Sequence, residues 1–142
     1  MKIEFEITDI PNEEQKKYPV AYLEGILKIF VCDKIFFDQS GILLIEFAIS
    51  INNWLRNIKQ GEIVDFIYLS MDNDEPILFI NHVVDNNYKI NSIWQEVEVS
   101  EFLIMEDIVI EFENFLDDLA IILKLTAKIE LNSILYDGNF PN

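Results

Sequence analysis

Residues 42–58 read ILLIEFAISINNWLRNI, and this stretch decides the fold because its apolar spacing differs from that of the segments around it. Its apolar residues recur at steps of three and four, the period of a helix with one face in a core. They are Leu44, Ala48, Ile51, Leu55 and Ile58, and the polar residues opposite them are Glu46, Ser50, Asn53 and Asn57. The pattern predicts an amphipathic helix over 42–58, for which Gly61 supplies a stop signal.

The segments on either side of this helix have the composition of strands. Polar and apolar side chains alternate in residues 2–8, which is typical of a half-buried strand. Further strands are predicted where β-branched and aromatic residues gather, at 22–31, 35–37, 63–69, 77–83 and 88–99. Asp33-Lys34 is the predicted turn of a hairpin, and residues 9–19, which hold two prolines, form a loop with room for one helical turn.

A second amphipathic helix is predicted at about 107–125. Its apolar stripe consists of Ile108, Phe112, Phe115, Leu119 and Ile122, with Glu113, Asp117 and Lys124 across from it. We therefore expect an α+β fold, in which an antiparallel β-sheet of about five to six strands is packed on one face by two amphipathic helices. Residues 1–142 are expected to form a single domain, with 131–142 as an irregular tail.

Composition and cysteine content indicate a protein of a reducing compartment. Apolar residues make up 51% of the chain, yet the longest apolar runs, 42–45 and 119–123, are far shorter than the ~20 residues of a membrane span. Charges alternate with apolar residues in residues 1–6, unlike a secretory signal, so we expect a cytoplasmic protein. Cys32 is the only cysteine and is interpreted as a packed or turn-flanking residue, the alternative being a reactive thiol.

The net charge of −16 is concentrated in one half of the sequence. Residues 60–123 hold fifteen acidic residues and a single basic one, Lys89. Such a surface repels phosphate backbones and anionic lipids, so we expect neither nucleic acid nor membrane as a partner. It would steer a basic protein toward itself, although acidic residues can also serve solubility alone.

We find no pattern typical of a catalytic, metal or cofactor site. The single histidine, His82, is interpreted as structural, and the four glycines stand apart, so no phosphate-binding loop is present. Residues 71–76 hold three carboxylates but lack the glycine and distal glutamate of a calcium-binding EF-hand loop, which favours a solvated turn or a recognition surface. Glu113 and Asp117 lie one helical turn apart and are interpreted as a solvated helix face.

The two tryptophans are candidates for either core or interface. Trp54 lies beside the apolar stripe of the first helix, which favours packing. Trp94 follows a strand pattern with Ile90 and Ser92 on its face, and its role as packed residue or exposed anchor stays open.

Three short stretches, 51–55 (INNWL), 68–76 (YLSMDNDEP) and 90–95 (INSIWQ), occur in this order before the terminal helix. Together they resemble an uncharacterised family of small bacterial domains, over roughly residues 20 to 125. More loosely, they are similar to immunity proteins of bacterial polymorphic toxin systems. The resemblance implies a cytoplasmic α+β domain without enzymatic activity and, for the immunity class, a tight complex with a cognate toxin.

We therefore predict a non-enzymatic acidic binding protein of the immunity type, which would neutralise a basic toxin. One alternative is a structural or assembly subunit that forms a homodimer, and another is a carboxylate- or metal-dependent hydrolase. No catalytic, cofactor or metal residues are assigned. The predicted partner-binding residues lie in the acidic turn, beside it in the sheet and on the last helix: Asp72, Asp74, Glu75, Trp94, Asp117 and Asp118.

Overall fold

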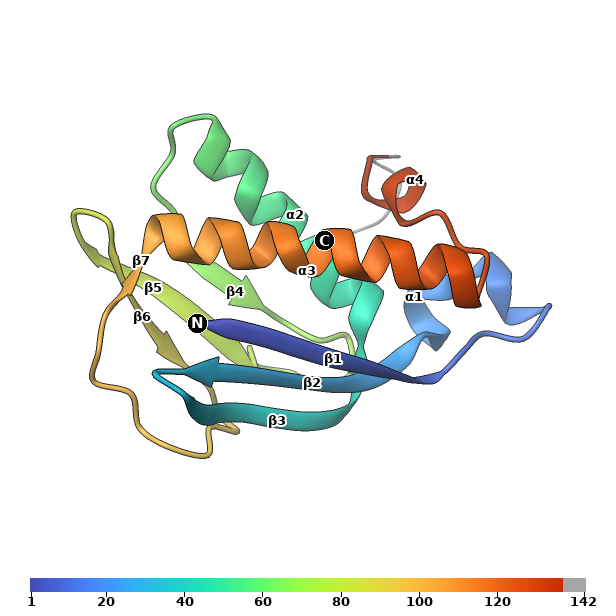
Figure 1. The fold of residues 1–142 in the computed structure, drawn as a ribbon, viewed down its shortest axis with the longest axis horizontal. Coiled ribbons are helices and arrows are strands. Elements are labelled where there is room, and N and C mark those ends of the chain that lie inside the picture. The colour runs from blue at the N-terminus through green and yellow to red at the C-terminus, as the bar shows by residue number, and fades with distance from the viewer. Residues whose placement is uncertain (137–142) are drawn as a thin grey trace.

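A computed structural model describes residues 1–136 of the chain as an α+β fold with two antiparallel sheets (Figure 1). The elements, in chain order, are β1 Lys2–Asp9, the 3-10 helix η1 Gln15–Lys17, α1 Pro19–Tyr22, β2 Glu24–Val31, β3 Lys34–Leu43, α2 Leu44–Lys59, β4 Phe66–Tyr68, β5 Leu78–Val84, β6 Asn87–Asn91, β7 Leu103–Ile104, α3 Met105–Thr126 and α4 Leu131–Tyr136.

The strands form two sheets, so the prediction of one sheet of five to six strands is wrong. One sheet has the order β1-β2-β3 and the other the order β4-β5-β6-β7, and every pairing is antiparallel. The division falls at α2, which begins directly where β3 ends and carries the chain about 24 Å onward at 1.5 Å per residue. Beyond this helix, β4 pairs with β5 of the hairpin that follows it and not with β3.

The first hairpin turns one residue earlier than predicted. Cys32 and Asp33 occupy the turn with positive φ angles of 50° and 63°, as a two-residue primed turn requires, and Lys34 already belongs to β3. Cys32 is exposed in this turn. Tyr22, predicted to open a strand, ends the short helix α1 instead, where Pro19 stands at the first position.

The strand predicted at 88–99 ends at Asn91, and Trp94 lies in the loop that follows. The loop is held by hydrogen bonds that a strand could not make: the backbone N–H of Trp94 donates to Ser92 Oγ (3.0 Å), and the Ser92 hydroxyl donates to the Ile77 carbonyl. Further along, the N–H of Glu96 donates to the Phe36 carbonyl (2.8 Å), which ties the loop to β3. The Ser92 hydroxyl thus accepts from a backbone N–H that a continued strand would use for pairing, and the strand ends.

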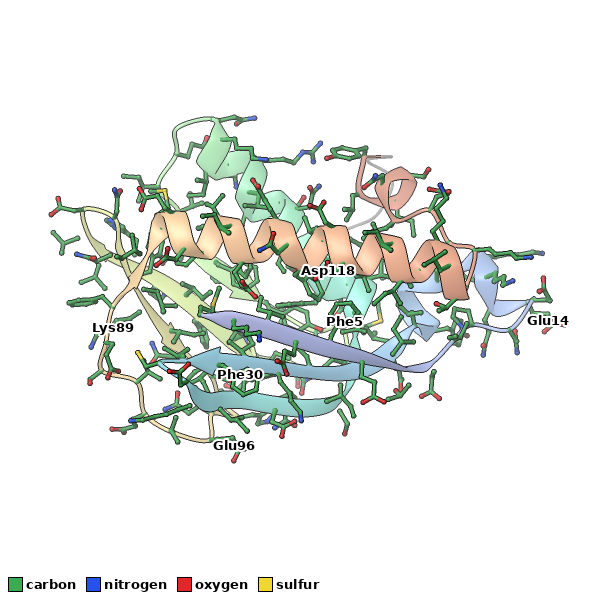
Figure 2. All side chains as sticks on the ribbon, viewed as in Figure 1. Phe5, Glu14, Phe30, Lys89, Glu96 and Asp118 are labelled. Carbon is green, nitrogen blue, oxygen red and sulfur yellow. The ribbon has the colours of Figure 1, made fainter. Side chains whose placement is uncertain are left out.

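Both amphipathic helices were predicted correctly in place and type, and they pack on one hydrophobic core with both sheets. Phe47 of α2 contacts the rings of Phe66 and Tyr68 of β4 and Phe115 of α3, with ring centroids 6.2, 5.1 and 5.3 Å away. Phe115 also contacts Phe5 of β1 (5.3 Å), below α3 in Figure 2. One member of the predicted stripe is wrong: Ile122 is 36% exposed, and Leu123 takes its place in the core.

The chain beyond α3 is not wholly irregular, as α4 occupies Leu131–Tyr136 where a tail was predicted. Leu131 and Leu135 are buried, and the Leu135 carbonyl accepts a hydrogen bond from the Asn52 side chain of α2 (3.4 Å). Two apolar residues four apart suffice for one buried helical turn, a signal too short to stand out in sequence. The rest of the predicted tail, 137–142, lies outside the described residues.

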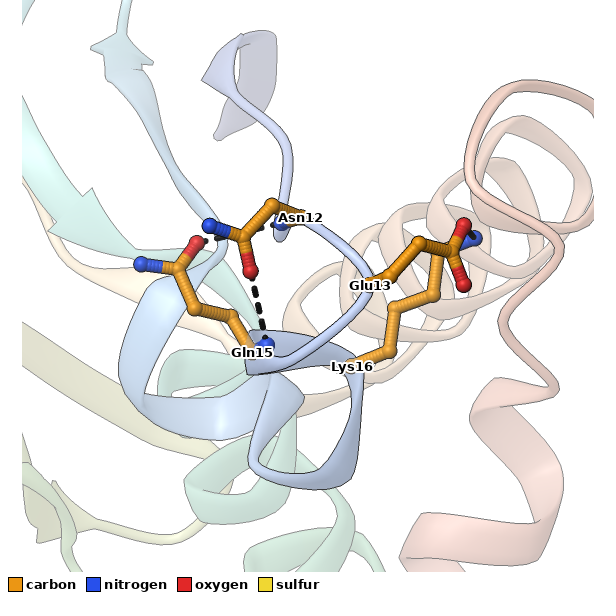
Figure 3. Close-up of polar contacts among 4 residues, drawn as sticks. All are labelled: Asn12, Glu13, Gln15 and Lys16. Atoms are coloured by element: carbon orange, nitrogen blue, oxygen red, sulfur yellow. Dashed lines mark hydrogen bonds and ion pairs between the residues drawn. The ribbon is translucent and has the colours of Figure 1, made fainter.

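The loop over 9–19 contains the predicted helical turn, which is η1. Polar side chains of the loop stabilise the start of this turn (Figure 3). The N–H of Gln15 donates to Asn12 Oδ1 (2.9 Å), and the N–H of Asn12 donates to Gln15 Oε1 (3.1 Å). This reciprocal pair is the geometry of a capping box. Lys16 and Glu13 form an ion pair beside it (3.0 Å), so the segment that leads into α1 has a defined shape. In residues 1–136, no helix combines the length and apolar character needed to cross a membrane.

Candidate binding groove

A groove of about 770 Å³ lies between the outer side of α2 and the segment that contains β4, with α1 at one end. Most of the side chains that line it are apolar or uncharged. The lining residues come from α1 and the residue before it (Tyr18, Val20, Ala21), from α2 (Glu46, Ile49, Ser50, Asn53, Trp54, Asn57) and from the segment around β4 (Val64, Asp65, Phe66, Ile67, Leu69, Ser70, Met71, Asn73).

The wall from α2 is the polar side of the predicted helix. Glu46, Ser50, Asn53 and Asn57 follow one another at steps of four, three and four, so they lie along one line of the helix. Asn53 and Ser50 are half-buried, and Ile49 adds an apolar side chain to this wall. Apart from Glu46 this wall carries no charge, which suits the recognition of apolar and hydrogen-bonding groups.

The opposite wall is the free edge of β4. This strand pairs with β5 on one side and is the first strand of its sheet, so its other side has no strand neighbour among the described residues. A cavity on one face of a sheet would touch every second residue, because successive side chains point to opposite faces. Here Phe66 and its neighbour Ile67 in β4 both line the groove, which therefore follows the edge of the strand.

The side chains at this edge expose apolar surface. Ile67 is 50% exposed and Leu69 is 51% exposed, and Ile63 and Met71 beside them are exposed as well. Neighbouring exposed apolar residues next to a concave surface are typical of a protein or ligand contact.

Trp54 forms part of the floor and is fixed in place. Its side chain is only 3% exposed, and its indole N–H donates to the Val64 carbonyl (2.9 Å). Its ring meets Phe112 and Tyr88 edge-on, at 5.5 and 6.1 Å. The prediction that Trp54 packs in the core or at its boundary is correct.

Glu46 joins the two walls at one end of the groove. Its carboxylate accepts hydrogen bonds from the Tyr68 hydroxyl (2.9 Å) and from the backbone N–H of Met71 (3.2 Å). Burial, together with the neighbouring Glu46 carboxylate, raises the pKa of Tyr68 well above its usual range, so this hydroxyl stays a donor. The contact holds the loop after β4 against α2.

Asp65 is the second charged residue of the lining. Its carboxylate accepts a hydrogen bond from the N–H of His82 (2.7 Å) and one from the Asn81 side chain (3.4 Å), which anchors the segment before β4 to β5. The ring of His82 contacts the Asp85 carbonyl through Nε2 (2.7 Å). This contact joins His82 of β5 to the turn that follows the strand. Both charged residues of the groove lining, Glu46 and Asp65, are negative.

The residues predicted to bind a partner lie in three separate parts of the molecule. Asp72, Asp74 and Glu75 are exposed in the loop that continues from the groove wall past Met71. Trp94 is half-buried in the loop after β6, against Phe37 of β3 (6.5 Å between ring centroids). Asp117 and Asp118 are exposed on α3, and Figure 2 shows Asp118 there, apart from Glu96 on the loop of Trp94.

The groove itself was not predicted, although its α2 wall was named as the polar side of a helix. One signal was available: three of the four polar residues on that side are Ser or Asn, whereas a fully solvated helix side is usually charged. The wall formed by the segment around β4 could not be predicted, because its position depends on how the second sheet packs against α2.

Carboxylates do not converge here into a metal site. Within residues 1–136, no group of three or more His, Cys, Asp or Glu side chains is placed to hold a metal ion. The acidic turn at 71–76 is a loop with its side chains in solvent, apart from half-buried Asn73 and Pro76.

The family of this chain follows from its comparison with known proteins. Neither the curated proteins nor the solved structures contain a match to this chain. A family of uncharacterised domains does match, over residues 1–124, which include both sheets and nearly all of α3. The chain therefore belongs to the family described as Domain of unknown function (DUF7878).

Proposed function

We propose that this domain is a non-enzymatic protein-binding module, and that the groove between α2 and β4 binds a basic partner protein. The observation that carries the proposal is one concave surface between a half-buried helix side and an edge of β4 that has no strand neighbour within residues 1–136. Ile67 and Leu69 supply apolar contact area at the rim. Pockets that join apolar area to a few fixed polar groups are typical binding sites.

Charge supports a basic partner. The chain carries a net charge of −16, both charged residues of the groove lining are acidic, and the loop at its end adds Asp72, Asp74 and Glu75. A field of one sign steers an oppositely charged protein and raises its rate of association. A toxin neutralised by this chain, as expected for an immunity protein, would be a partner of this kind, and that role is part of the proposal.

Hydrolysis by carboxylates is not the function that this geometry favours. The two carboxylates of the groove, Glu46 and Asp65, already accept hydrogen bonds from the surrounding fold. They act as structural anchors, whereas an acid–base pair needs a carboxylate directed at a substrate.

Site-specific cross-linking tests the proposal. The photoreactive residue p-benzoylphenylalanine replaces Ile67 in the groove or, as the matched control, Ile121 on the outer side of α3, which is 59% exposed. Both variants are irradiated in cells of the source organism, and adducts are identified by mass spectrometry. We expect the variant at Ile67 to yield one basic protein, and its purified complex with the unmodified chain to weaken as salt rises.

The control determines where the partner binds. An adduct obtained only at Ile121 would transfer the binding surface to α3 and contradict the groove. Adducts of this chain with itself at Ile67 would support the homodimer alternative. No adduct at either position would contradict a protein-binding function for the exposed surfaces tested.

A further inference from the structure

We infer that the partner contributes an extended segment that pairs with the free edge of β4 as an added strand, a mode of binding that rests on the proposed function. The segment contains apolar side chains at alternate positions and at least one lysine or arginine. Addition of a strand to an open sheet edge supplies backbone hydrogen bonds for affinity and alternate side-chain contacts for specificity.

The backbone of β4 is oriented for this pairing. The Tyr68 carbonyl accepts a hydrogen bond from the N–H of Ile77, so the polar backbone groups of Tyr68 face the β5 side. Backbone groups of successive strand residues point in opposite directions. Those of Ile67 therefore point away from β5, toward the groove, and offer one donor and one acceptor to a new strand.

This edge lacks two of the features by which proteins usually block unwanted strand pairing, lysine and proline residues. Such edges typically carry lysine or proline or lie under another element. The stretch from Val64 to Met71 contains neither lysine nor proline, and its Ile67 and Leu69 side chains are about half exposed. β4 is short, but the groove follows the chain beyond both of its ends, from Val64 to Asn73.

The surroundings of the edge define the two faces of an added strand. Side chains on one face would meet the α2 wall at Ile49 and Asn53, where apolar contact and an amide are available. Those on the other face would extend the row formed by Ile67 and its cross-strand neighbour Phe79. An alternating apolar pattern satisfies both surfaces, because strand side chains alternate between faces.

Charge selects the remaining positions of the segment. Asp65 precedes β4 and Asp72 follows it, while the groove lining contains no lysine or arginine. A basic side chain near either end of the segment therefore gains attraction, whereas an acidic one is repelled. An acidic or uniformly polar strand would be a poor occupant.

The test uses peptides selected without knowledge of the partner. A phage library of random dodecapeptides is selected on the purified protein. The same library is selected in parallel on the variant Asn53→Trp, whose larger side chain occupies the groove beside α2. We expect sequences with alternating apolar residues and a basic residue to be enriched on the wild type only. If Asn53→Trp fails to fold by circular dichroism, Asn57→Trp serves as the second groove variant.

Backbone methylation then separates strand pairing from side-chain binding. The strongest peptide is synthesised twice, with N-methyl groups on the odd or on the even residues of its central part. An added strand uses only one of these two sets of N–H groups to pair with β4. One methylated peptide should therefore lose binding by about tenfold or more, and the other should stay within about threefold of the parent.

The outcomes distinguish this inference from the proposed function. Selected peptides that depend on the groove but tolerate or resist methylation equally on both sets would overturn strand addition and leave groove binding standing. Enriched sequences with apolar residues at steps of three and four would point to a helical occupant and also overturn it. Failure to enrich any peptide that discriminates wild type from the groove variants would count against both.

Discussion

The helices α2 and α3 direct similar apolar stripes into the same core, but their outer sides differ in shape and charge. The outer side of α2 is mostly uncharged and faces the edge of β4 across the groove. The outer side of α3 exposes Asp117 and Asp118 among isoleucines and is the more acidic of the two. The predicted binding residues include Asp117 and Asp118 on α3 and none on α2, because charge is visible in sequence, whereas a concave site requires a second element beside the helix.

The largest expected effect contrasts the inner and outer sides of α3. Phe112→Ala removes a ring that is 1% exposed and lies 5.0 Å from Phe66 and 5.5 Å from Trp54, between centroids. We expect it to lower the free energy of unfolding by about 3–5 kcal/mol, and Ile121→Ala on the outer side to change it by less than about 0.5 kcal/mol. Urea titration followed by circular dichroism measures both.

A comparable loss in the two variants of α3 would show that its outer side is also covered, which would change the comparison between the helices. Equal and small losses would contradict the core position of Phe112.

The next effect contrasts the two outer sides directly, with the same substitution in each helix. Asn53→Trp fills the groove, whereas Asn114→Trp adds the same ring to the exposed side of α3. With the cross-linked partner or a selected peptide as ligand, we expect Asn53→Trp to weaken binding by about 100-fold, or about 2.7 kcal/mol, and Asn114→Trp by less than about twofold. Calorimetric titration gives both dissociation constants.

If Asn114→Trp weakens binding more than Asn53→Trp, the partner binds to the outer side of α3 and not in the groove beside α2. Both proteins are first checked for wild-type thermal stability, so that a loss of binding is not a loss of fold.

A third prediction concerns the polar contact that joins the groove walls. Because the pKa of Tyr68 is raised in the folded protein, this residue stabilises the fold below its unfolded pKa of about 10 and loses that contribution as pH rises further. Above pH 10 the free energy of unfolding should fall by about 1.4 kcal/mol more per pH unit in the wild type than in Tyr68→Phe.

Tyr88, whose pKa burial and Asp65 also raise, adds a second contribution of the same sign. Tyr88→Phe and the double variant show whether the two contributions add. Identical alkaline slopes for the wild type and Tyr68→Phe would mean that the Tyr68 hydroxyl is accessible to solvent, contrary to the described contact with Glu46.

The smallest effect tests charge outside the groove. Replacing Asp72, Asp74 and Glu75 with lysine should slow association with the basic partner by about three- to tenfold at low salt and reduce its salt dependence. The matched change on α3, Asp117→Lys with Asp118→Lys, should have the smaller effect because these residues lie away from the groove. Stopped-flow measurements at two salt concentrations compare them, and unchanged rates in the first variant would remove the turn from the recognition surface.

Local patterns in the sequence were sufficient to predict most elements. Steps of three and four identified α2 and most of the buried side of α3, and alternation identified β1. The patterns failed where side chains redirect the backbone: Ser92 ends β6 early, and the positive φ angles of Cys32 and Asp33 move the turn by one residue. Neither effect changes the spacing of apolar residues in the surrounding segment, so the hydrophobic pattern could not reveal it.

Residue patterns alone predict the α+β class, the two amphipathic helices, the acidic character and the uncharged Ser and Asn side of α2. They do not predict that the strands divide into two sheets, that one side of β4 has no strand neighbour within residues 1–136, or that this side faces Asn53 across a groove. Periodicity records which side of an element is buried, while strand order and concave surfaces depend on contacts between residues distant in the chain.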